Sequence, residues 1–380
     1  MTERLSERAV ASRKKRLESV RSRMTEMSVD ALVLSLGADL PWLTGYVAMP
    51  LERLTAFVLR ADGQAVLVVP ELEAPRVASA PELFEVRAWG ELEDPVGIVC
   101  GILPSRAARV GISDRAWAAF LLAFQEQAPA AAWLKASKVT SELRAIKDVS
   151  ELDSLRAASA AADRVAGALQ AGEITLLGKT ESEVSEEIGN RLITEGHDQV
   201  NFAIVGSGPN GASPHHHAGT RVIDRGDVVV CDFGGALCLD GEVGYCSDVT
   251  RTVTVGEPSD PEALRCYEVL RAAQRAGVEA VAPGASAQSV DEAARDVITE
   301  AGYGDHFIHR TGHGIGIEEH EDPYIVNGNQ TALEPGHCFS IEPGIYLPGR
   351  FGMRLEDIVA VTATGVERLN EADHAMVSIL

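Results

Sequence analysis

The chain has 380 residues, enough for two domains, and 46% of them are hydrophobic, which excludes a disordered polypeptide. Its net charge of −22 argues against nucleic acid and anionic membranes as partners. The N-terminal residues lack the apolar core of a signal peptide, and no run approaches the ~20 apolar residues of a membrane span. The six cysteines form no CxxC pair, so we expect a reducing cytoplasmic compartment.

The first part of the chain alternates helix and strand patterns. We expect helices at 5–27, 71–80 and 91–103, and strands at 31–36, 54–60, 65–70, 83–88 and 108–113. This rhythm predicts a small α/β domain with a mixed sheet. A charged and then alanine-rich helical stretch follows, and it places the boundary between two domains, 1–145 and 146–380.

The second part is expected to be richer in irregular strands. Helix patterns cover 150–171, 180–195, 261–281 and 287–302. Strand patterns and glycine loops begin at Asn201 and return over the last eighty residues.

Two aspartates lie in short segments with strand patterns. In VVVCDFGG, Asp232 is predicted to end a buried strand, where a carboxylate is costly unless it is paired or bound to a metal. A turn-capping aspartate before glycines is the alternative. In GYCSDVTRT, Asp248 is predicted to begin a strand with a polar face, and a solvated aspartate at a strand end is the alternative.

Two glutamates lie in the strand-rich C-terminal segment. Glu342 falls in FSIEPGIY, inside an apolar run and directly before Pro343. Glu356 falls in RLEDIVAVT, on the same face of the predicted strand as Arg354. A buried ion pair, for which Arg354 is the candidate partner, is the alternative role for either glutamate.

Histidines gather in two glycine-rich or turn-rich segments. HRTGHGIGIEEHEDP holds His309, His313 and His320 but matches neither HExxH nor GxGxxG, and incidental loop histidines are the alternative. The loop PHHH holds three adjacent histidines, His215, His216 and His217. Such histidines are either exposed or donate hydrogen bonds to a substrate, and the sequence pattern alone does not say which of the three contacts a substrate. If the four carboxylates converge on the imidazole of His313, two divalent metal ions are the simplest way to neutralise them.

Taken together and in this order, the segments resemble the pita-bread metallopeptidases, which include aminopeptidase P, prolidase (Xaa-Pro dipeptidase) and methionine aminopeptidase. The resemblance covers about 150–380. The first 140 residues resemble, more loosely, the extra domain of aminopeptidase P, prolidase and creatinase, which methionine aminopeptidase lacks. The resemblance implies an α/β (α+β) protein, with a small creatinase-like domain followed by a pita-bread domain.

The resemblance also implies roles for individual residues. The five metal ligands of the family fall on Asp232, Asp248, His313, Glu342 and Glu356, and its proton-relay and substrate-contacting histidines fall on His215, His309 and His320. The sixteen residues from Asp232 to Asp248 exceed the usual spacing, which offers Asp240 as another ligand. Asp232 is preferred, because Asp240-Gly241 reads as a hairpin turn.

The expected chemistry is hydrolysis of an Xaa-Pro bond at two divalent ions bridged by Asp248 and Glu356. A bridging hydroxide would attack the carbonyl, with Glu342 as general base and His320 stabilising the oxyanion. Four carboxylates and one imidazole favour hard ions, so Mn²⁺ is expected first, with Co²⁺ or Zn²⁺ possible.

A dipeptidase is expected to need a cation for the proline carboxylate. Arg350 is predicted to be that cation, with Arg354 as the alternative. We therefore expect an Xaa-Pro dipeptidase, before an aminopeptidase P acting on longer peptides. Creatinase-like amidinohydrolase chemistry and a non-catalytic peptide-binding module are remote alternatives, and the resemblance implies a homodimer.

Overall fold

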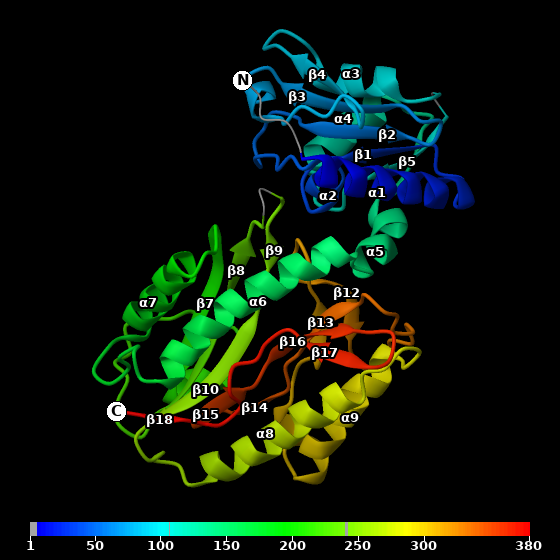
Figure 1. Cartoon of the computed structure of the whole chain (residues 1–380). Helices are drawn as coiled ribbons and strands as arrows, with labels where there is room; N and C mark the ends of the chain where they lie inside the picture. The colour runs from blue at the N-terminus through cyan, green and yellow to red at the C-terminus, as the bar shows by residue number, and fades with distance from the viewer. Residues whose placement is uncertain (1–5, 106, 240–241) are drawn as a thin grey trace. The chain divides into compact units, whose positions relative to one another are not determined.

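The computed structural model describes residues 6–105, 107–239 and 242–380. The chain divides into two compact units at Arg144 and Ala145, apart from a short segment around residue 242 that groups with the first unit. Both units mix helices and strands, as the sequence predicts (Figure 1). Of the described helices, none is both long and apolar enough to cross a membrane.

The first unit is built on one mixed sheet. Its helices are α1 (Glu7–Glu26), α2 (Asp39–Thr44), η1 (Ala74–Arg76), α3 (Pro95–Ile102), α4 (Ala118–Gln127) and α5 (Ser137–Ala145). Its strands are β1 (Ala31–Leu34), β2 (Ala56–Arg60), β3 (Ala65–Pro70), β4 (Glu85–Trp89), β5 (Arg109–Ile112) and β6 (Ala132–Lys135). The described strands follow the order β4-β3-β2-β1-β5-β6, and β2 runs antiparallel to both of its neighbours. The mixed sheet is thereby confirmed.

One predicted helix of this unit is wrong. The segment 71–80 forms only the single 3-10 turn η1, because Pro75 lies inside it and Pro81 follows it. Each proline removes a backbone N–H donor, and its ring disfavours the helical conformation of the preceding residue. Helices α2 and α4 and strand β6 form in segments where the sequence reading predicted no element.

The second unit carries the longer helices. They are α6 (Val149–Gln170), α7 (Glu181–Thr194), α8 (Glu262–Glu279) and α9 (Ala287–Glu300), with short 3-10 turns η2 (Gly208–Ala212) and η3 (Gly304–His306). Both α6 and α7 begin with a capping box, in which Asp148 and Thr180 accept the backbone N–H of Glu151 and Glu183. These caps explain why the helices begin where they do.

Two sheets and a two-stranded ribbon complete the second unit. The first sheet holds β7 (Gln199–Ser207), β8 (Val228–Leu237), β9 (Tyr245–Cys246), β10 (Val249–Val255) and β18 (Ser378–Ile379). The second holds β11 (Gly312–Gly314), β12 (Glu321–Ile325), β13 (Cys338–Ile341), β16 (Asp357–Val361) and β17 (Val366–Arg368), and the ribbon pairs β14 (Gly344–Leu347) with β15 (Phe351–Arg354).

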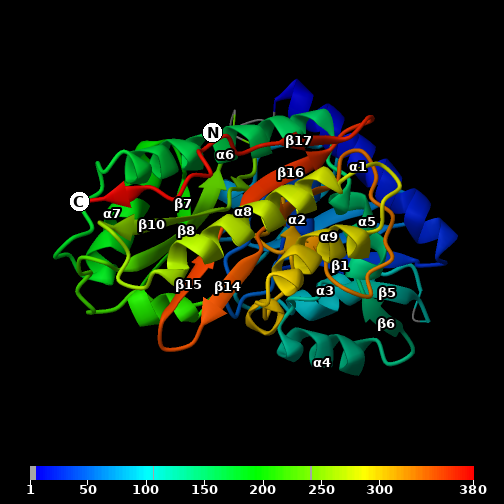
Figure 2. The ribbon, with the colours of Figure 1, turned by 90° about the horizontal axis from the view of Figure 1, so that it is seen from below.

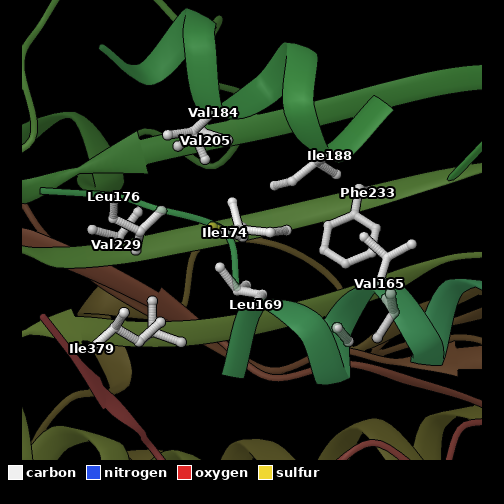
Figure 3. Packing of buried hydrophobic residues seen from close by; sticks show 14 of the residues in the cluster. Val165, Leu169, Ile174, Leu176, Val184, Ile188, Val205, Val229, Phe233 and Ile379 are labelled. Carbon is white, nitrogen blue, oxygen red and sulfur yellow. The ribbon is translucent and has the colours of Figure 1, made fainter. Parts of the chain in front are cut away.

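Helices cover each of these sheets. Helices α6 and α7 pack over β7 and β8, where Leu169, Ile188 and Phe233 are fully buried in one apolar cluster (Figure 3). Helix α8 packs on β14 and β15 (Figure 2). Helix α9 packs on β12. A backbone bridge between Thr250 and Glu356 joins the first sheet to the segment that follows β15. The inner surfaces of the two sheets therefore meet where the predicted ligands lie.

Candidate metal centre

Asp232 lies in the middle of a strand, not at its end. Strand β8 continues through it to Leu237, which corrects the sequence-based prediction. Gly234 and Gly235 mark close strand contacts instead of a turn, because a Cβ atom at these positions would lie 2.1 Å from the Ser247 carbonyl oxygen and 2.3 Å from that of Gln199. The side chain of Asp232 is buried.

Asp248 and Glu356 approach from opposite sheets. Asp248 directly precedes β10, and Glu356 lies between β15 and β16. The Thr250 hydroxyl donates to Glu356 Oε2 over 2.7 Å, and Arg251 Nη1 donates to the Glu356 carbonyl over 2.6 Å. Both carboxylates are buried, so the predicted polar face of β10 looks into the protein and not into solvent.

His313 lies in β11, and Glu342 directly follows β13, which pairs with β11 in the second sheet. A Cβ atom at Gly312 would lie 1.8 Å from the Ser340 carbonyl oxygen, so glycine allows β11 to approach β13. The Ser340 hydroxyl accepts the His313 backbone N–H over 3.0 Å and donates to Glu342 Oε1 over 3.0 Å. His313 Nε2 lies 3.2 Å from that same Glu342 oxygen.

The ring of His313 has a defined orientation. Its Nδ1 lies 3.2 Å from the Gly314 carbonyl, which can only accept, so Nδ1 carries a proton. Nε2 faces the carboxylates of Glu342 and Asp248, 3.2 Å and 3.7 Å away. Either a proton or a metal ion between these atoms satisfies them, which is the usual arrangement of a metal-binding histidine.

The five residues fit a metal centre. Ligand atoms of Asp248, His313 and Glu356 lie within 4.8 Å of one another. One oxygen each of Asp232, Asp248 and Glu356 is buried without a hydrogen-bond partner among the described residues. Unpartnered buried carboxylate oxygens are costly unless a cation balances them, and hard divalent ions prefer such oxygen ligands. The structure thus brings all five predicted ligands together.

Burial and mutual repulsion perturb these carboxyl groups. Burial, followed by the charges of Glu356 and Asp232, raises the pKa of Asp248. Burial and the charges of Glu342 and Asp232 likewise raise the pKa of Glu356. For Glu342 burial also acts upward, but the hydrogen bond and charge of His313 lower its pKa to about 2. Glu342 therefore stays ionised more readily than Asp248 and Glu356.

Arg354 is a buried internal counter-ion. Its Nη2 donates to Asp232, its Nε donates to Thr250 Oγ1 over 3.1 Å, and its Nη1 donates to the Tyr346 hydroxyl over 2.7 Å. Burial raises the pKa of Tyr346 to about 12, so this phenol is neutral. The sequence reading missed Tyr346, whose period-two position on β14 resembles that of any buried strand residue.

The three predicted histidines all line the cavity above the ligands. His309 donates from Nδ1 to the Arg310 carbonyl over 2.7 Å, so its Nε2 accepts from the Tyr346 hydroxyl over 3.0 Å. The ring centroids of His320 and His313 lie 4.0 Å apart. Burial, followed by the charge of His313, lowers the pKa of His320 to about 4. His215 also lines the cavity, whereas His216 pairs with Glu181.

The cavity has a volume of about 330 Å³. Beside the ligands and histidines, its wall contains apolar side chains of Phe202, Ile204 and Pro214 and the charged side chains of Arg310, Glu319 and Arg354. Arg350 is not among the lining residues. Its guanidinium pairs with Asp260 at 2.7 Å and Glu262 at 2.6 Å. The alternative ligand Asp240 lies outside the described residues.

Comparison with known proteins follows the same division of the chain. The sequence model of metallopeptidase family M24 matches residues 153–363, and that of the creatinase/prolidase N-terminal domain matches residues 16–146. A probable dipeptidase PepE from Mycobacterium bovis is 43% identical over 368 residues, covering 96% of each chain. An Xaa-Pro dipeptidase from Lactobacillus delbrueckii subsp. lactis is 35% identical, covering 92% of this chain and 95% of the relative. The crystal structure of dipeptidase PepE from Mycobacterium ulcerans has a TM-score of 0.91 at 41% identity and covers 99% of each chain.

Proposed function

The chain belongs to metallopeptidase family M24 and carries a creatinase/prolidase N-terminal domain, so it is a metal-dependent peptidase, and we propose that it hydrolyses dipeptides with proline in the second position. The predicted pita-bread resemblance is confirmed. The names of its relatives, a probable dipeptidase and an Xaa-Pro dipeptidase, support a dipeptide substrate.

We propose that two divalent ions bind the cluster of Asp232, Asp248, His313, Glu342 and Glu356. The observation that carries this proposal is the set of three buried carboxylate oxygens without a partner among the described residues. Such ions would lower the pKa of a bound water and polarise the scissile carbonyl. Mn²⁺ is proposed first, with Co²⁺ or Zn²⁺ as alternatives, because oxygen ligands outnumber the single imidazole.

The side chains around this cluster have distinct proposed roles in moving protons. Glu342 accepts a proton from the attacking water and passes it to the leaving nitrogen, since it lines the cavity and Ser340 fixes its orientation. His320 donates an N–H to the developing oxyanion, and a neutral imidazole can still do so. His309, with both ring nitrogens occupied, orients Tyr346 and shapes the wall beside the substrate.

The charge and shape of the cavity suit a short zwitterionic peptide. Phe202, Ile204 and Pro214 offer an apolar wall for a proline ring, which has no N–H to satisfy. Arg310 lies in the same wall, with its guanidinium 4.4 Å from the ring centroid of Tyr324. It has no ion pair or side-chain hydrogen bond within the part of the chain that the structure describes. We propose that Arg310 binds the carboxylate of the proline.

Arg350 stays the sequence-based candidate for this carboxylate, but its position supports it less. Its guanidinium would have to leave both Asp260 and Glu262 to reach a substrate. Arg354, the other candidate, is already bound to Asp232. The cavity itself therefore favours Arg310.

Two further properties stay proposals. All six cysteines are free, which supports a reducing compartment such as the cytoplasm. The homodimer rests on the family resemblance.

The proposal that Arg310 binds the proline carboxylate is tested with a dipeptide and its amide. The wild type should prefer an Xaa-Pro dipeptide to the same dipeptide amide, and Arg310→Ala should lose kcat/KM for the free acid by about 10-fold to 100-fold, the range of a lost charged hydrogen bond. Arg350→Ala is the matched control and should keep the preference. If Arg350→Ala alone abolished it, the sequence-based assignment would be right and Arg310 would have no such role.

A further inference from the structure

A carboxylate outside the metal cluster and the cavity is completely buried. Glu181 is the first residue of α7, and its exposed fraction is 0%. A buried carboxylate is costly unless hydrogen bonds or charges compensate for the lost water. A position in the first turn of a helix favours a negative charge but cannot alone account for such burial. The contacts of Glu181 therefore indicate which part of the structure the buried carboxylate holds in place.

The two oxygens of Glu181 hold the loop that follows β7. Oε1 accepts the backbone N–H and the hydroxyl of Ser207 over 2.8 Å and 2.6 Å. Oε2 accepts from His216 Nε2 over 2.7 Å and from the backbone N–H of Gly219 over 3.3 Å. The amide of Asn210 lies 3.1 Å from each oxygen. One carboxylate thus fixes four points of a thirteen-residue segment, 207–219.

These donors keep Glu181 ionised. Burial would raise the pKa of its carboxyl group, but the hydrogen bonds from Ser207 and His216 outweigh burial and lower the pKa. The interaction is therefore between a charged acceptor and several donors, which is stronger than hydrogen bonding between neutral groups.

The loop held in this way carries His215 into the cavity. Its two neighbours in the chain are both anchored. His216 is bound by Glu181, and the Pro214 carbonyl accepts from Arg354 over 3.3 Å. The imidazole of His215 has no hydrogen bond within the described residues, so its position depends on the anchored backbone on either side of it.

We propose that Glu181 is a positioning residue for the peptidase reaction, acting through His215. The inference rests on the proposed function, because it assigns His215 to substrate contact. With its loop already ordered, His215 meets the substrate without an additional entropic cost on binding. Glu181 and Arg354 together link the loop to the metal ligand Asp232, which Arg354 also binds.

A double-mutant cycle between Glu181 and His215 tests this proposal. Glu181→Gln replaces one acceptor oxygen with an NH₂ group that cannot accept from His216 or Gly219. It should lower kcat/KM for an Xaa-Pro dipeptide by about 10-fold to 100-fold, as expected for a misplaced substrate-contacting group. In the His215→Ala background the same change should cost less than about 2-fold, because the group that it positions is already absent.

A purely structural role gives a different result. The two losses would then multiply in the double variant, and that result would overturn the proposal. Glu183→Gln is the matched control, because Glu183 caps the same helix from an exposed position, and it should lower thermal stability while leaving kcat/KM unchanged.

A second variant covers failure of Glu181→Gln to fold. His216→Ala removes one donor and leaves Glu181 bound to Ser207, Asn210 and Gly219, and the same non-additivity with His215→Ala is expected. If the wild type cleaves the dipeptide and the His215→Ala variant is fully active as well, this inference is overturned and the proposed function stands. A wild type that cleaves no Xaa-Pro dipeptide would instead remove the proposed function, and this inference with it.

Discussion

At the scale of residues, the cluster is defined by which carboxylate oxygens have partners. Glu356 Oε2 accepts from Thr250, but Oε1 has no partner among the described residues. Asp248 Oδ1 and Asp232 Oδ1 likewise have no hydrogen-bond partner among the described residues. A cluster in which three buried carboxylates each keep an unsatisfied oxygen is suited to binding cations and poorly suited to a purely structural role.

Replacing Glu356 with glutamine tests this account of the cluster. Glu356→Gln keeps the volume and an acceptor for Thr250 but removes the charge that faces Asp248 and His313. We expect the purified variant to bind fewer Mn²⁺ ions per chain, and kcat/KM to fall by about 100-fold or more. Inductively coupled plasma mass spectrometry measures the first and an Xaa-Pro assay the second.

The control for this variant is a glutamate outside the cluster. Glu367→Gln changes a residue of β17 that pairs with Arg156, and it should keep both metal and activity. Full metal content and full activity in Glu356→Gln would remove Glu356 from the ligand set.

The sequence predicted the residue types of the site better than it predicted their contacts. Asp248, His313 and Glu356 were named from local patterns and a family resemblance, and the structure brings them within 4.8 Å. Arg310 and Glu181 were missed, because a lone arginine beside a histidine and a glutamate in a first helical turn have common solvent-exposed roles. Their partners lie far away in sequence, and only the folded chain shows them.

At the scale of elements, close strand contacts at glycine determine how the ligands meet. Gly312 lies against the Ser340 carbonyl, and Gly234 lies against the Ser247 carbonyl. The sequence reading took the Gly-Gly after Asp232 as a strand end, because glycine is common in turns. Glycine also occurs where two backbones approach closely, and a single sequence does not distinguish these uses.

Gly312→Ala tests the importance of one such contact. The added methyl group would lie 1.8 Å from the Ser340 carbonyl oxygen, so β11 and β13 must separate and His313 must move. We expect a loss of stability of about 2 kcal/mol or more, as for other overpacked sites, together with weaker Mn²⁺ binding. Thermal unfolding with and without Mn²⁺ measures both effects.

Gly365→Ala is the matched control for this substitution. A Cβ atom at Gly365 would have no heavy atom within 4 Å, so stability and metal binding should be unchanged. If Gly312→Ala matched this control, the close contact would not be what positions His313.

The prediction of secondary structure succeeded where helices are long. Helices α6, α7, α8 and α9 were predicted to within a few residues. The elements that it missed or misplaced span ten residues or fewer. The helix expected at 71–80 contains Pro75, and α2 has only six residues, too few for a clear periodicity.

At the scale of the whole molecule, the proposed ligands come from both halves of the second unit. Asp232 and Asp248 belong to the half covered by α6 and α7, and His313, Glu342 and Glu356 belong to the half covered by α8 and α9. No local segment holds more than one ligand, so the centre forms only when both halves fold together. Metal binding should therefore stabilise the second unit as a whole.

The measurement that tests the central claim most directly is hydrolysis of an Xaa-Pro dipeptide beside the matching Xaa-Pro-Yaa tripeptide, each with Mn²⁺ and with a chelator. We expect cleavage that requires the metal and favours the dipeptide, because the proposed role of Arg310 is to bind a proline carboxylate that the tripeptide lacks. Preference for the tripeptide would make the protein an aminopeptidase and leave Arg310 without this role. Cleavage that persists in chelator would contradict the metal centre itself.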